Sequence, residues 1–443
     1  MTMTNRRSFL TAASSIGVAS LAGCLADVNV LDESGESETL TDSGADPDEN
    51  SSADPNETES ESDDEPDSDE STDELDHLPG ETIVDFEDLD SWIGMAGQGR
   101  IVDEDDDVYA GSRSARITAE EGIDYAATYR TYSDGLDLSG KNLSLAVKYT
   151  GRDQFDLTVQ LLAPNSQNVL SFRRSLTGPA DAWQRVDLGV NAVDTQPDLQ
   201  NVQEIRIIGR RRGDESGDIE FLVDDLRAVD RPDRGAVLLL FDATLESHYT
   251  TAFEITEEFG YPGVEAVIPE AVGESGRLTL DQMRELDDAG WDMVARPRTG
   301  AQFLHEFSTE QQEGLIRRTK AYLENRGFED GARHFVTPKN LIQAEAMEFV
   351  REYHEQAFRF GGAPNTIPTS DPHNLGTFGG TGSATRHFVD MAAQYDQLAV
   401  LRFEEIGDGE GAFDEDEFRE LLEHIDEKDV DVVSASDLLE RDA

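Results

Sequence analysis

Between residues 81 and 230, short runs of alternating apolar and polar residues follow one another. Gly, Pro, Asn and Asp, which favour turns, separate the runs. No amphipathic helical pattern interrupts them. Seven or more strands without a helix predict an antiparallel β-sandwich. The predicted strands are residues 83–86, 114–117, 143–147, 155–159, 184–188, 204–208 and 219–223.

After residue 235 the pattern changes to apolar strands alternating with amphipathic helices. This alternation predicts a parallel sheet covered by helices, and over about 210 residues a distorted (β/α) barrel is its natural closure. The predicted strands are residues 236–242, 263–269, 291–295, 334–338, 398–403 and 430–434, and the predicted helices are 249–259, 279–289, 308–326 and 414–425. We therefore predict a multidomain chain, with a jelly-roll sandwich at 80–230 and a barrel domain at 233–441.

The N-terminus carries the pattern of an export signal. Arg6 and Arg7 precede a modest apolar run that ends in Leu21-Ala22-Gly23-Cys24. This is typical of a twin-arginine signal followed by a lipobox, so residues 1–24 predict a lipoprotein signal with lipidation at Cys24. The alternative is a plain cleaved signal with an incidental cysteine. The expected location is the outer face of the cell membrane, with the lipid as the only membrane attachment.

Residues 25–79 predict a disordered acidic linker. Between Leu31 and Leu75 there are 20 carboxylates and no Lys or Arg, so this stretch has no means to build a core. We interpret it as a tether; a cation-binding or partner-binding tail, or an O-glycosylated segment, is the alternative.

The charge of the whole chain indicates a salt-adapted protein. The sequence has 95 acidic and 36 basic residues, for a net charge of -59, and Lys is scarce relative to Arg. Such self-repulsion becomes tolerable in molar salt, where the screening length falls to about 3 Å. The same charge excludes nucleic acid as a partner.

Three motifs of the predicted sandwich occur in a suggestive order: residues 85–88 with Trp92 close behind, residues 109–117, and residues 221–226. This order resembles the carbohydrate-binding jelly rolls of the galactose-binding-like group. The resemblance implies a structural Ca²⁺ held by Glu87, Asp224 and the backbone near Gly111, because Ca²⁺ prefers oxygen ligands. The alternative is that these acids are ordinary surface charges. Sugar contact would fall to aromatic residues, which are otherwise core residues: Tyr125, Tyr129, Tyr132 and Trp183.

The order of motifs in the second domain also matches a known pattern. The motifs are residues 240–244 (Leu-Phe-Asp-Ala-Thr), 289–300, 335–338 (Phe-Val-Thr-Pro) and 401–407 (Leu-Arg-Phe-Glu-Glu-Ile-Gly). Together they resemble the polysaccharide deacetylase family, which is characterised by the chitooligosaccharide-deacetylase homology domain. The resemblance implies a divalent metal, such as Zn²⁺, held by one Asp and two His; here those positions are Ala243, Arg296 and Gly300.

The same resemblance assigns the remaining roles. Asp242 corresponds to the general base, and Glu404 or Arg402 occupies the place of the general acid. The motif arginine is replaced by Val336, and Pro338 matches the proline of the same motif. Since no metal is expected beside Arg296, we predict Arg296 and Pro338 as substrate contacts.

The loss of three ligands removes the metal that would polarise the amide carbonyl and activate water. Arg296 at the former metal position suits a sugar carboxylate or sulfate, or simply an ion pair with Asp242. A rebuilt metal site is the alternative, with Glu246, His248 and His305 joining Asp242 at the end of the barrel where sites form. His373 and His387, in a predicted Gly-rich loop at 361–386, are weaker candidates.

We therefore expect a cell-surface lipoprotein that binds extracellular or envelope polysaccharide and has lost the usual metal-dependent catalysis. The first alternative is an active hydrolase that deacetylates a polysaccharide through a shifted metal site. The second is a non-catalytic structural protein of the envelope.

Overall fold

The computed structural model describes residues 75–151, 154–211, 218–407 and 412–442. The predicted signal, Cys24 and nearly all of the predicted linker lie outside the described residues. The described residues belong to one compact unit. No helix in the described ranges is long and apolar enough to cross a membrane.

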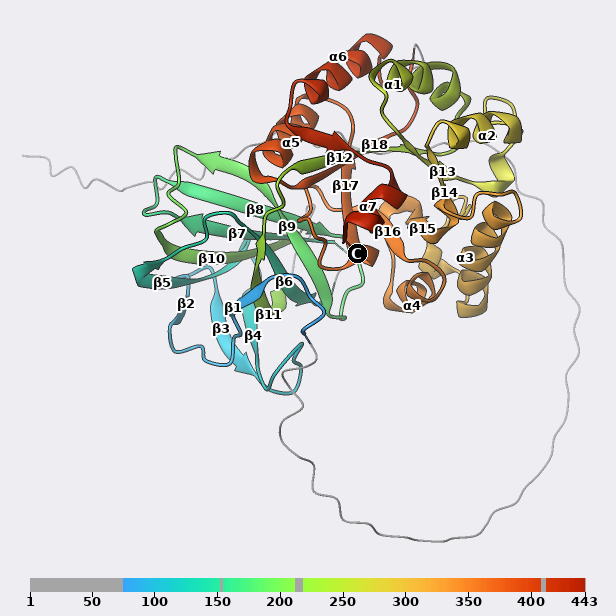
Figure 1. Cartoon of the computed structure of the whole chain (residues 1–443). Coiled ribbons are helices and arrows are strands. Elements are labelled where there is room, and N and C mark those ends of the chain that lie inside the picture. Colours follow the sequence, from blue (N-terminus) through green and yellow to red (C-terminus); the bar gives the residue numbers. More distant parts are fainter. Residues whose placement is uncertain (1–74, 152–153, 212–217, 408–411, 443) are drawn as a thin grey trace, which may run out of the picture. The chain divides into compact units, whose positions relative to one another are not determined.

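An antiparallel β-sandwich forms the first part of this unit, as the alternating pattern predicted (Figure 1). Strand β9 links the two layers, because its first half pairs with β6 and its second half with β8. The strands are β1 (Glu81–Val84), β2 (Trp92–Gly94), β3 (Arg100–Glu104), β4 (Ser114–Ala119), β5 (Ala126–Leu136), β6 (Lys141–Tyr149), β7 (Phe155–Leu162), β8 (Val169–Leu176), β9 (Gln184–Asp194), β10 (Val202–Arg211) and β11 (Ile219–Asp230).

Each of the seven predicted runs contains or overlaps a strand, and the prediction missed β2, β3, β5 and β8. Strand β5 was missed because Asp134 and Gly135 interrupt its alternation. Strand β8 carries two consecutive arginines, Arg173 and Arg174. The burial of strand β8 depends on partners elsewhere in the chain, which the local pattern does not reveal.

The second part is a closed barrel of seven parallel strands, β12 to β18, with β19 paired to the outer side of β12. Strand β12 closes the barrel by pairing with both β13 and β18. The strands are β12 (Gly235–Asp242), β13 (Val264–Val267), β14 (Asp292–Ala295), β15 (His334–Val336), β16 (Gln356–Phe360), β17 (Leu375–Gly379), β18 (Leu398–Phe403) and β19 (Val430–Val432).

Helices cover the outside of the barrel (Figure 1). Thr279 and Ser308 begin α2 and α3 with reciprocal capping boxes, since each accepts a hydrogen bond from the residue three positions on. The helices are α1 (Glu254–Phe259), α2 (Leu280–Asp288), α3 (Thr309–Glu324), α4 (Ala344–Tyr353), α5 (Ser383–Tyr395), α6 (Glu415–Asp426) and α7 (Ala435–Asp442). A one-turn π-helix at His248–Phe253 precedes α1.

Alternation along the barrel strands separates two apolar layers. Val237, Leu239 and Phe241 of β12 face the helices, whereas Leu238 and Leu240 face the barrel interior. The interior is filled by residues of this second kind together with Leu438 of α7. Side chains that continue the inward row beyond the strand ends therefore converge at the carboxyl end of the barrel.

The predicted Gly-rich loop at 361–386 is wrong. It contains β17 and the first turn of α5, and the preceding strand β16 was also missed. The glycines that suggested a loop serve close packing instead: a Cβ at Gly376 would lie 2.0 Å from Nη1 of Arg174. Tertiary contact with the sandwich thus decides the structure of this stretch.

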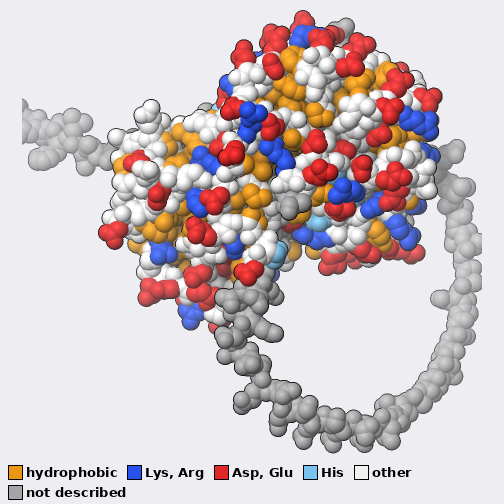
Figure 2. Space-filling view, viewed as in Figure 1, with side chains coloured by type: hydrophobic (Ala, Val, Ile, Leu, Met, Phe, Trp, Pro, Cys, Tyr) orange, Lys and Arg blue, Asp and Glu red, His pale blue; other side chains and the backbone are white. Residues whose placement is uncertain are grey.

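Carboxylate groups are spread among basic groups over the visible face of the described part (Figure 2). Several form ion pairs at the surface, such as Arg419 with Glu258 and Arg333 with Glu355. Exposed pairs of this kind stabilise a fold only weakly, so they compensate little of the repulsion that the net negative charge causes.

Candidate functional site

Three charged side chains meet at the carboxyl end of the barrel. Each is the next inward-facing residue after the interior layer of its strand: Asp242 follows Leu240, Arg296 lies two positions after Val294, and Arg402 follows Val400. Nε of Arg296 lies 2.7 Å from Oδ1 of Asp242, and Nη2 of Arg402 donates to Oδ2. The predicted ion pair between Asp242 and Arg296 is therefore present, with a second arginine added.

This arrangement makes Asp242 a very weak base. The carboxylate is 2% exposed, and burial alone would raise its pKa. The positive charges of Arg402 and Arg296 outweigh burial and lower the pKa to about 2. A general base works best with a pKa near the operating pH, so Asp242 has little affinity for a proton taken from water.

The three family positions for the metal offer no ligand in the structure. Ala243 has a φ of +85°, and its carbonyl oxygen accepts a hydrogen bond from Nη1 of Arg277 at 2.5 Å. Gly300 has a φ of +59° in the segment after β14. Arg296 places a cation where the family has a histidine. The residues present do not fit a catalytic divalent metal.

The structure does not assemble the residues of the rebuilt metal site around His248. Its Nδ1 lies 2.7 Å from Oε2 of Glu265, and its Nε2 lies 2.8 Å from the carbonyl oxygen of Glu404, so both ring nitrogens already have partners. The imidazole is fully buried. Glu265 also accepts from the amide of Thr244, which ties β12 to β13. His248 therefore supports the strand ends below the site.

The other two proposed ligands are not brought to His248. Glu246 is exposed, and His305 stacks on Phe303 with ring centroids 5.7 Å apart. Within the described ranges, the only three acidic, His or Cys residues whose ligand atoms lie within 4.8 Å of one another are Glu104, Asp105 and Asp106 of the sandwich. These three include exposed surface acids.

Two residues, Arg402 and Glu404, lie near the position that the general acid has in the deacetylase family. Arg402 points to Asp242 and also donates to Oδ1 of Asn340. Glu404 has an exposed side chain, and only its backbone contacts His248. Of the two residues predicted for this position, Arg402 therefore occupies the inward one, and Glu404 does not. Pro338 is buried, which removes it as a direct substrate contact.

The two further histidines serve the packing of their own segments. Nε2 of His373 lies 2.7 Å from the carbonyl oxygen of His354, and Nε2 of His387 lies 2.8 Å from that of Asn191. Neither contacts Asp242.

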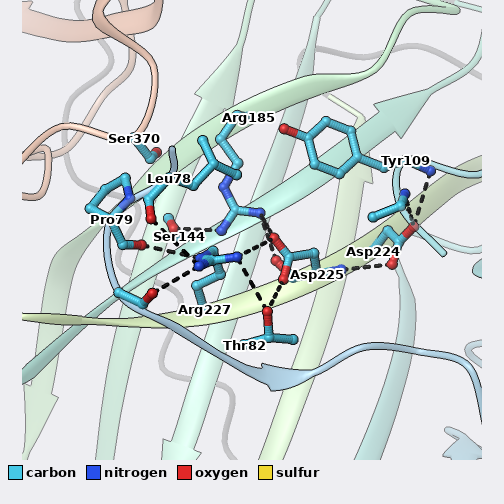
Figure 3. Close-up of polar contacts among 12 residues, drawn as sticks. Leu78, Pro79, Thr82, Tyr109, Ser144, Arg185, Asp224, Asp225, Arg227 and Ser370 are labelled. Carbon is cyan, nitrogen blue, oxygen red and sulfur yellow. Dashed lines mark hydrogen bonds and ion pairs between the residues drawn. The ribbon is translucent and has the colours of Figure 1, made fainter. Parts of the chain in front are cut away.

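The predicted calcium residues bind the backbone of one loop. Asp224 accepts hydrogen bonds from the amides of Tyr109 and Ala110, both at 3.0 Å (Figure 3). Glu87 accepts from the amide and hydroxyl of Ser112, at 2.7 and 2.6 Å. Burial raises the pKa of Asp224 to about 6, against the effect of its three amide donors. Both acids thus hold the loop after β3, and bound calcium stays a prediction.

Asp225 points the opposite way from Asp224, into a buried cluster (Figure 3). Its carboxylate accepts from Arg185 at 2.8 Å and from Thr82 at 2.6 Å. Arg227 lies 3.4 Å from the same carboxylate and donates to the carbonyl oxygen of Gly80 at 2.8 Å. Leu78 is already buried here, so ordered packing begins inside the predicted linker.

The proposed aromatic contacts differ in their surroundings. The guanidinium of Arg210 lies 5.5 Å from the ring centre of Tyr125. Tyr132 has a buried hydroxyl without a hydrogen-bond partner. Trp183 is half-buried just before β9 and donates from Nε1 to Asp107 at 2.9 Å.

The sequence analysis named Tyr129 but missed the polar row to which it belongs, across four strands of the sandwich. Tyr129 of β5 is paired with Arg206 of β10, Arg206 with Gln160 of β7, and Gln160 with Ser171 of β8. Nε2 of Gln160 donates to Ser171 at 3.2 Å. The signal in the sequence was the strict alternation of these residues with buried Ile205, Ile207, Leu157, Val159 and Leu161.

No protein-family model matches this sequence, and no curated protein matches it. Among solved structures, the chain is similar to the Xyl-CE4 domain of a multidomain xylanase from the hindgut metagenome of Trinervitermes trinervoides, with 15% identity and a TM-score of 0.32 over 47% of this chain and 91% of that chain. It is also similar to a family 4 carbohydrate esterase from Streptomyces lividans in complex with acetate, with 12% identity and a TM-score of 0.32 over 44% and 90% of the two chains.

A further similarity is to the family 11 carbohydrate-binding module of the cellulosomal cellulase Lic26A-Cel5E of Clostridium thermocellum. The identity is 18% and the TM-score 0.26, over 34% of this chain and 95% of that chain. These neighbours are of the two kinds that the motif resemblances predicted. At such identities and TM-scores, function has to be argued from the residues themselves.

Proposed function

We propose that this protein is a cell-surface lipoprotein that binds extracellular or envelope polysaccharide, and that its barrel does not carry out metal-dependent deacetylation. The observation that supports the absence of metal-dependent deacetylation is the position of Asp242 between two arginines. Arg296 stands where the metal of a deacetylase would stand, and Arg402 satisfies the other carboxylate oxygen. A divalent cation placed there would face two positive charges and a single negative one.

The proposed binding of polysaccharide is supported by the polar row on the sandwich. Tyr129, Arg206 and Gln160 are half-exposed and lie side by side on neighbouring strands. A tyrosine ring offers an apolar surface to sugar C–H groups, while guanidinium and amide groups form hydrogen bonds with hydroxyls. The resemblance of the sandwich motifs to carbohydrate-binding jelly rolls supports the same ligand class.

The proposed location rests on the sequence alone. Arg6, Arg7 and Cys24 form the export and lipidation pattern, and the acidic stretch behind Cys24 is long enough to hold the folded part away from the membrane.

The test of catalysis measures acetate release from acetylated chitin and xylan oligomers, with and without chelator, and the metal content of the purified protein. We expect no chelator-sensitive acetate release and no stoichiometric metal. The triple variant Ala243→Asp, Arg296→His, Gly300→His is the matched comparison, and it should gain zinc affinity. Chelator-sensitive acetate release by the wild type would overturn the proposal.

The test of binding measures retention of the protein on insoluble polysaccharides and on isolated cell envelopes in molar salt. We expect retention on at least one polysaccharide, and Tyr129→Ala should weaken it without moving the melting temperature. Retention on none of them, with binding to envelopes after their glycans are removed, would favour a structural role in the envelope.

A further inference from the structure

A cleft lies where the sandwich meets the barrel. It has a volume of about 150 Å³ and is lined by Trp183 and Gln184 from the sandwich, by the α4 residues Glu348 and Arg351, and by Asp371. Drug-sized ligands occupy pockets of roughly 300 Å³ or more. This cleft therefore suits a ligand of about one ring.

One wall of the cleft is a fixed aromatic ring. Nε1 of Trp183 donates to Oδ1 of Asp107, and Oδ2 of Asp107 lies 2.5 Å from Nζ of Lys148. The ring of Tyr109 lies behind it, with centroids 5.8 Å apart. Since these contacts hold the indole in place, little side-chain entropy is lost when a ligand packs against it.

The opposite wall carries charged groups that can bind hydroxyls. Nη2 of Arg351 lies 2.5 Å from Oδ2 of Asp371, and 47% of the Arg351 side chain remains exposed. Glu348 lies one turn earlier on α4 and is exposed. A guanidinium donates and a carboxylate accepts, which matches the mixed donors and acceptors of neighbouring hydroxyls.

The charges around the cleft balance. Arg351 and the buried Arg359 are positive, and Glu348 and Asp371 are negative. An ionic ligand would therefore gain no net attraction from the lining. A neutral ring with many hydroxyls matches this lining better than an anion or a cation does.

The two walls are held together by buried hydrogen bonds. Arg359 of the barrel donates to Oε1 of Gln184 at 2.5 Å and to Oδ1 of Asn374 at 2.8 Å. Asn374 in turn donates to the carbonyl oxygen of Arg185 at 2.9 Å. All of these side chains are buried. The cleft is thus preorganised, which lowers the entropic cost of binding.

We infer that this junction cleft binds one neutral pyranose ring, with the ring C–H groups against Trp183 and the hydroxyls on Arg351 and Glu348. The inference rests on the proposed polysaccharide binding and names a second contact for the same ligand. It is distinct from the polar row of Tyr129 and from the charged group around Asp242.

The test uses the emission of Trp183 in the full chain. The other two tryptophans, Trp92 and Trp291, are 5% and 2% exposed, so a surface ligand should act mainly on Trp183. The probes are glucose, galactose and N-acetylglucosamine, with glucuronic acid as the charged comparison. We expect a saturable change with at least one neutral sugar.

The variants Arg351→Met and Glu348→Ala should weaken this binding by about tenfold each, the effect of losing a hydrogen bond to a charged group. Glu352→Gln, an exposed change on the same helix away from the cleft, should leave it unchanged. Trp183→Phe, checked for an unaltered melting temperature and followed by calorimetry, should also weaken binding.

Three results would overturn the inference. A protein that is retained on polysaccharide but shows no saturable change with any neutral sugar has its binding site elsewhere, and the proposed function survives. Saturation by glucuronic acid alone would make the ligand class wrong. Absence of binding to both polysaccharide and monosaccharides would remove the proposed function together with the inference.

Discussion

Replacing Asp242 by Asn is the sharpest test of the charge arrangement in the barrel. The change keeps the shape of the side chain and removes the only negative charge that both Arg296 and Arg402 contact. Two guanidinium groups, with 16% and 12% of their side chains exposed, would then share a neutral partner.

The loss of folding stability in Asp242→Asn can be estimated in two ways. The pKa of Asp242 falls from 3.8 to about 2, which corresponds to about 2 kcal/mol of stabilisation of the folded state. Removing one partner of a buried ion pair costs roughly 3–5 kcal/mol. Because the arginines keep some contact with solvent, we expect a loss of about 3 kcal/mol, or about 4 °C in melting temperature for a unit of this size.

The assay is thermal unfolding in molar salt, followed by circular dichroism, with Glu246→Gln as the matched control. Glu246 is exposed near the same strand end, so its loss should change the melting temperature little. Salt at this concentration screens surface charges much more than buried pairs, which isolates the effect of Asp242.

The pH dependence has a defined sign. The folded-state pKa is below the unfolded value of 3.8, so the stabilisation by Asp242 is complete above about pH 4 and is lost as the pH falls through about 2. The wild type and the Asn variant should therefore converge in acid. If Asp242→Asn behaves like Glu246→Gln at neutral pH, the carboxylate is not held by the arginines, and the argument against catalysis loses its basis.

Four further outcomes are expected. Burial raises the pKa of Asp187 to about 6, so the folded state loses stability as the pH rises from about 3.8 to about 6 and the loss is constant above that; Asp187→Asn should make the melting temperature less dependent on pH over that range, and an unchanged pH profile would contradict this. Cys24→Ser should release the protein from the membrane fraction or leave it uncleaved, and unchanged fractionation would refute the lipobox. Dialysis from molar to about 0.1 M salt should lower the melting temperature, because the screening length grows from about 3 to 10 Å; a salt-independent value would contradict the salt-adapted interpretation. Chelation should destabilise the sandwich if calcium binds near Glu87 and Asp224, and an unmoved transition would remove that prediction.

The sequence predicted the two-part fold because most of its strands and helices keep their periodicity locally. The exceptions lie where partners come from far away. Strand β17 has the sequence Leu-Gly-Thr-Phe-Gly, which carries no strand signal of its own. Its Gly376 donates to Oδ1 of Asn365 and lies close to the guanidinium of Arg174. Such burial depends on residues some 10 to 200 positions away.

The candidate site was predictable in part. The alternate, inward-facing residues that lead to Asp242, Arg296 and Arg402 can be followed in the sequence. The ion pair between Asp242 and Arg296 was among the alternatives predicted from it. The role of His248 was not anticipated, although a glutamate within the apolar run Val264-Glu265-Ala266-Val267 was a signal that a buried partner exists. A motif comparison assigns roles by position and does not reveal which nitrogen is already bonded.

The boundary between sandwich and barrel has a consequence for how the chain can be divided. Arg174 is fully buried against Asn365 and Asn374 of the barrel, and Asp187 accepts from Thr366 and Ser370. A fragment that ends at Asp230 would expose this arginine and this carboxylate together with the apolar side chains around them. The two parts are therefore not interchangeable modules. A chimaera that replaces the sandwich or the barrel would also have to supply buried partners for the residues of the part that is kept.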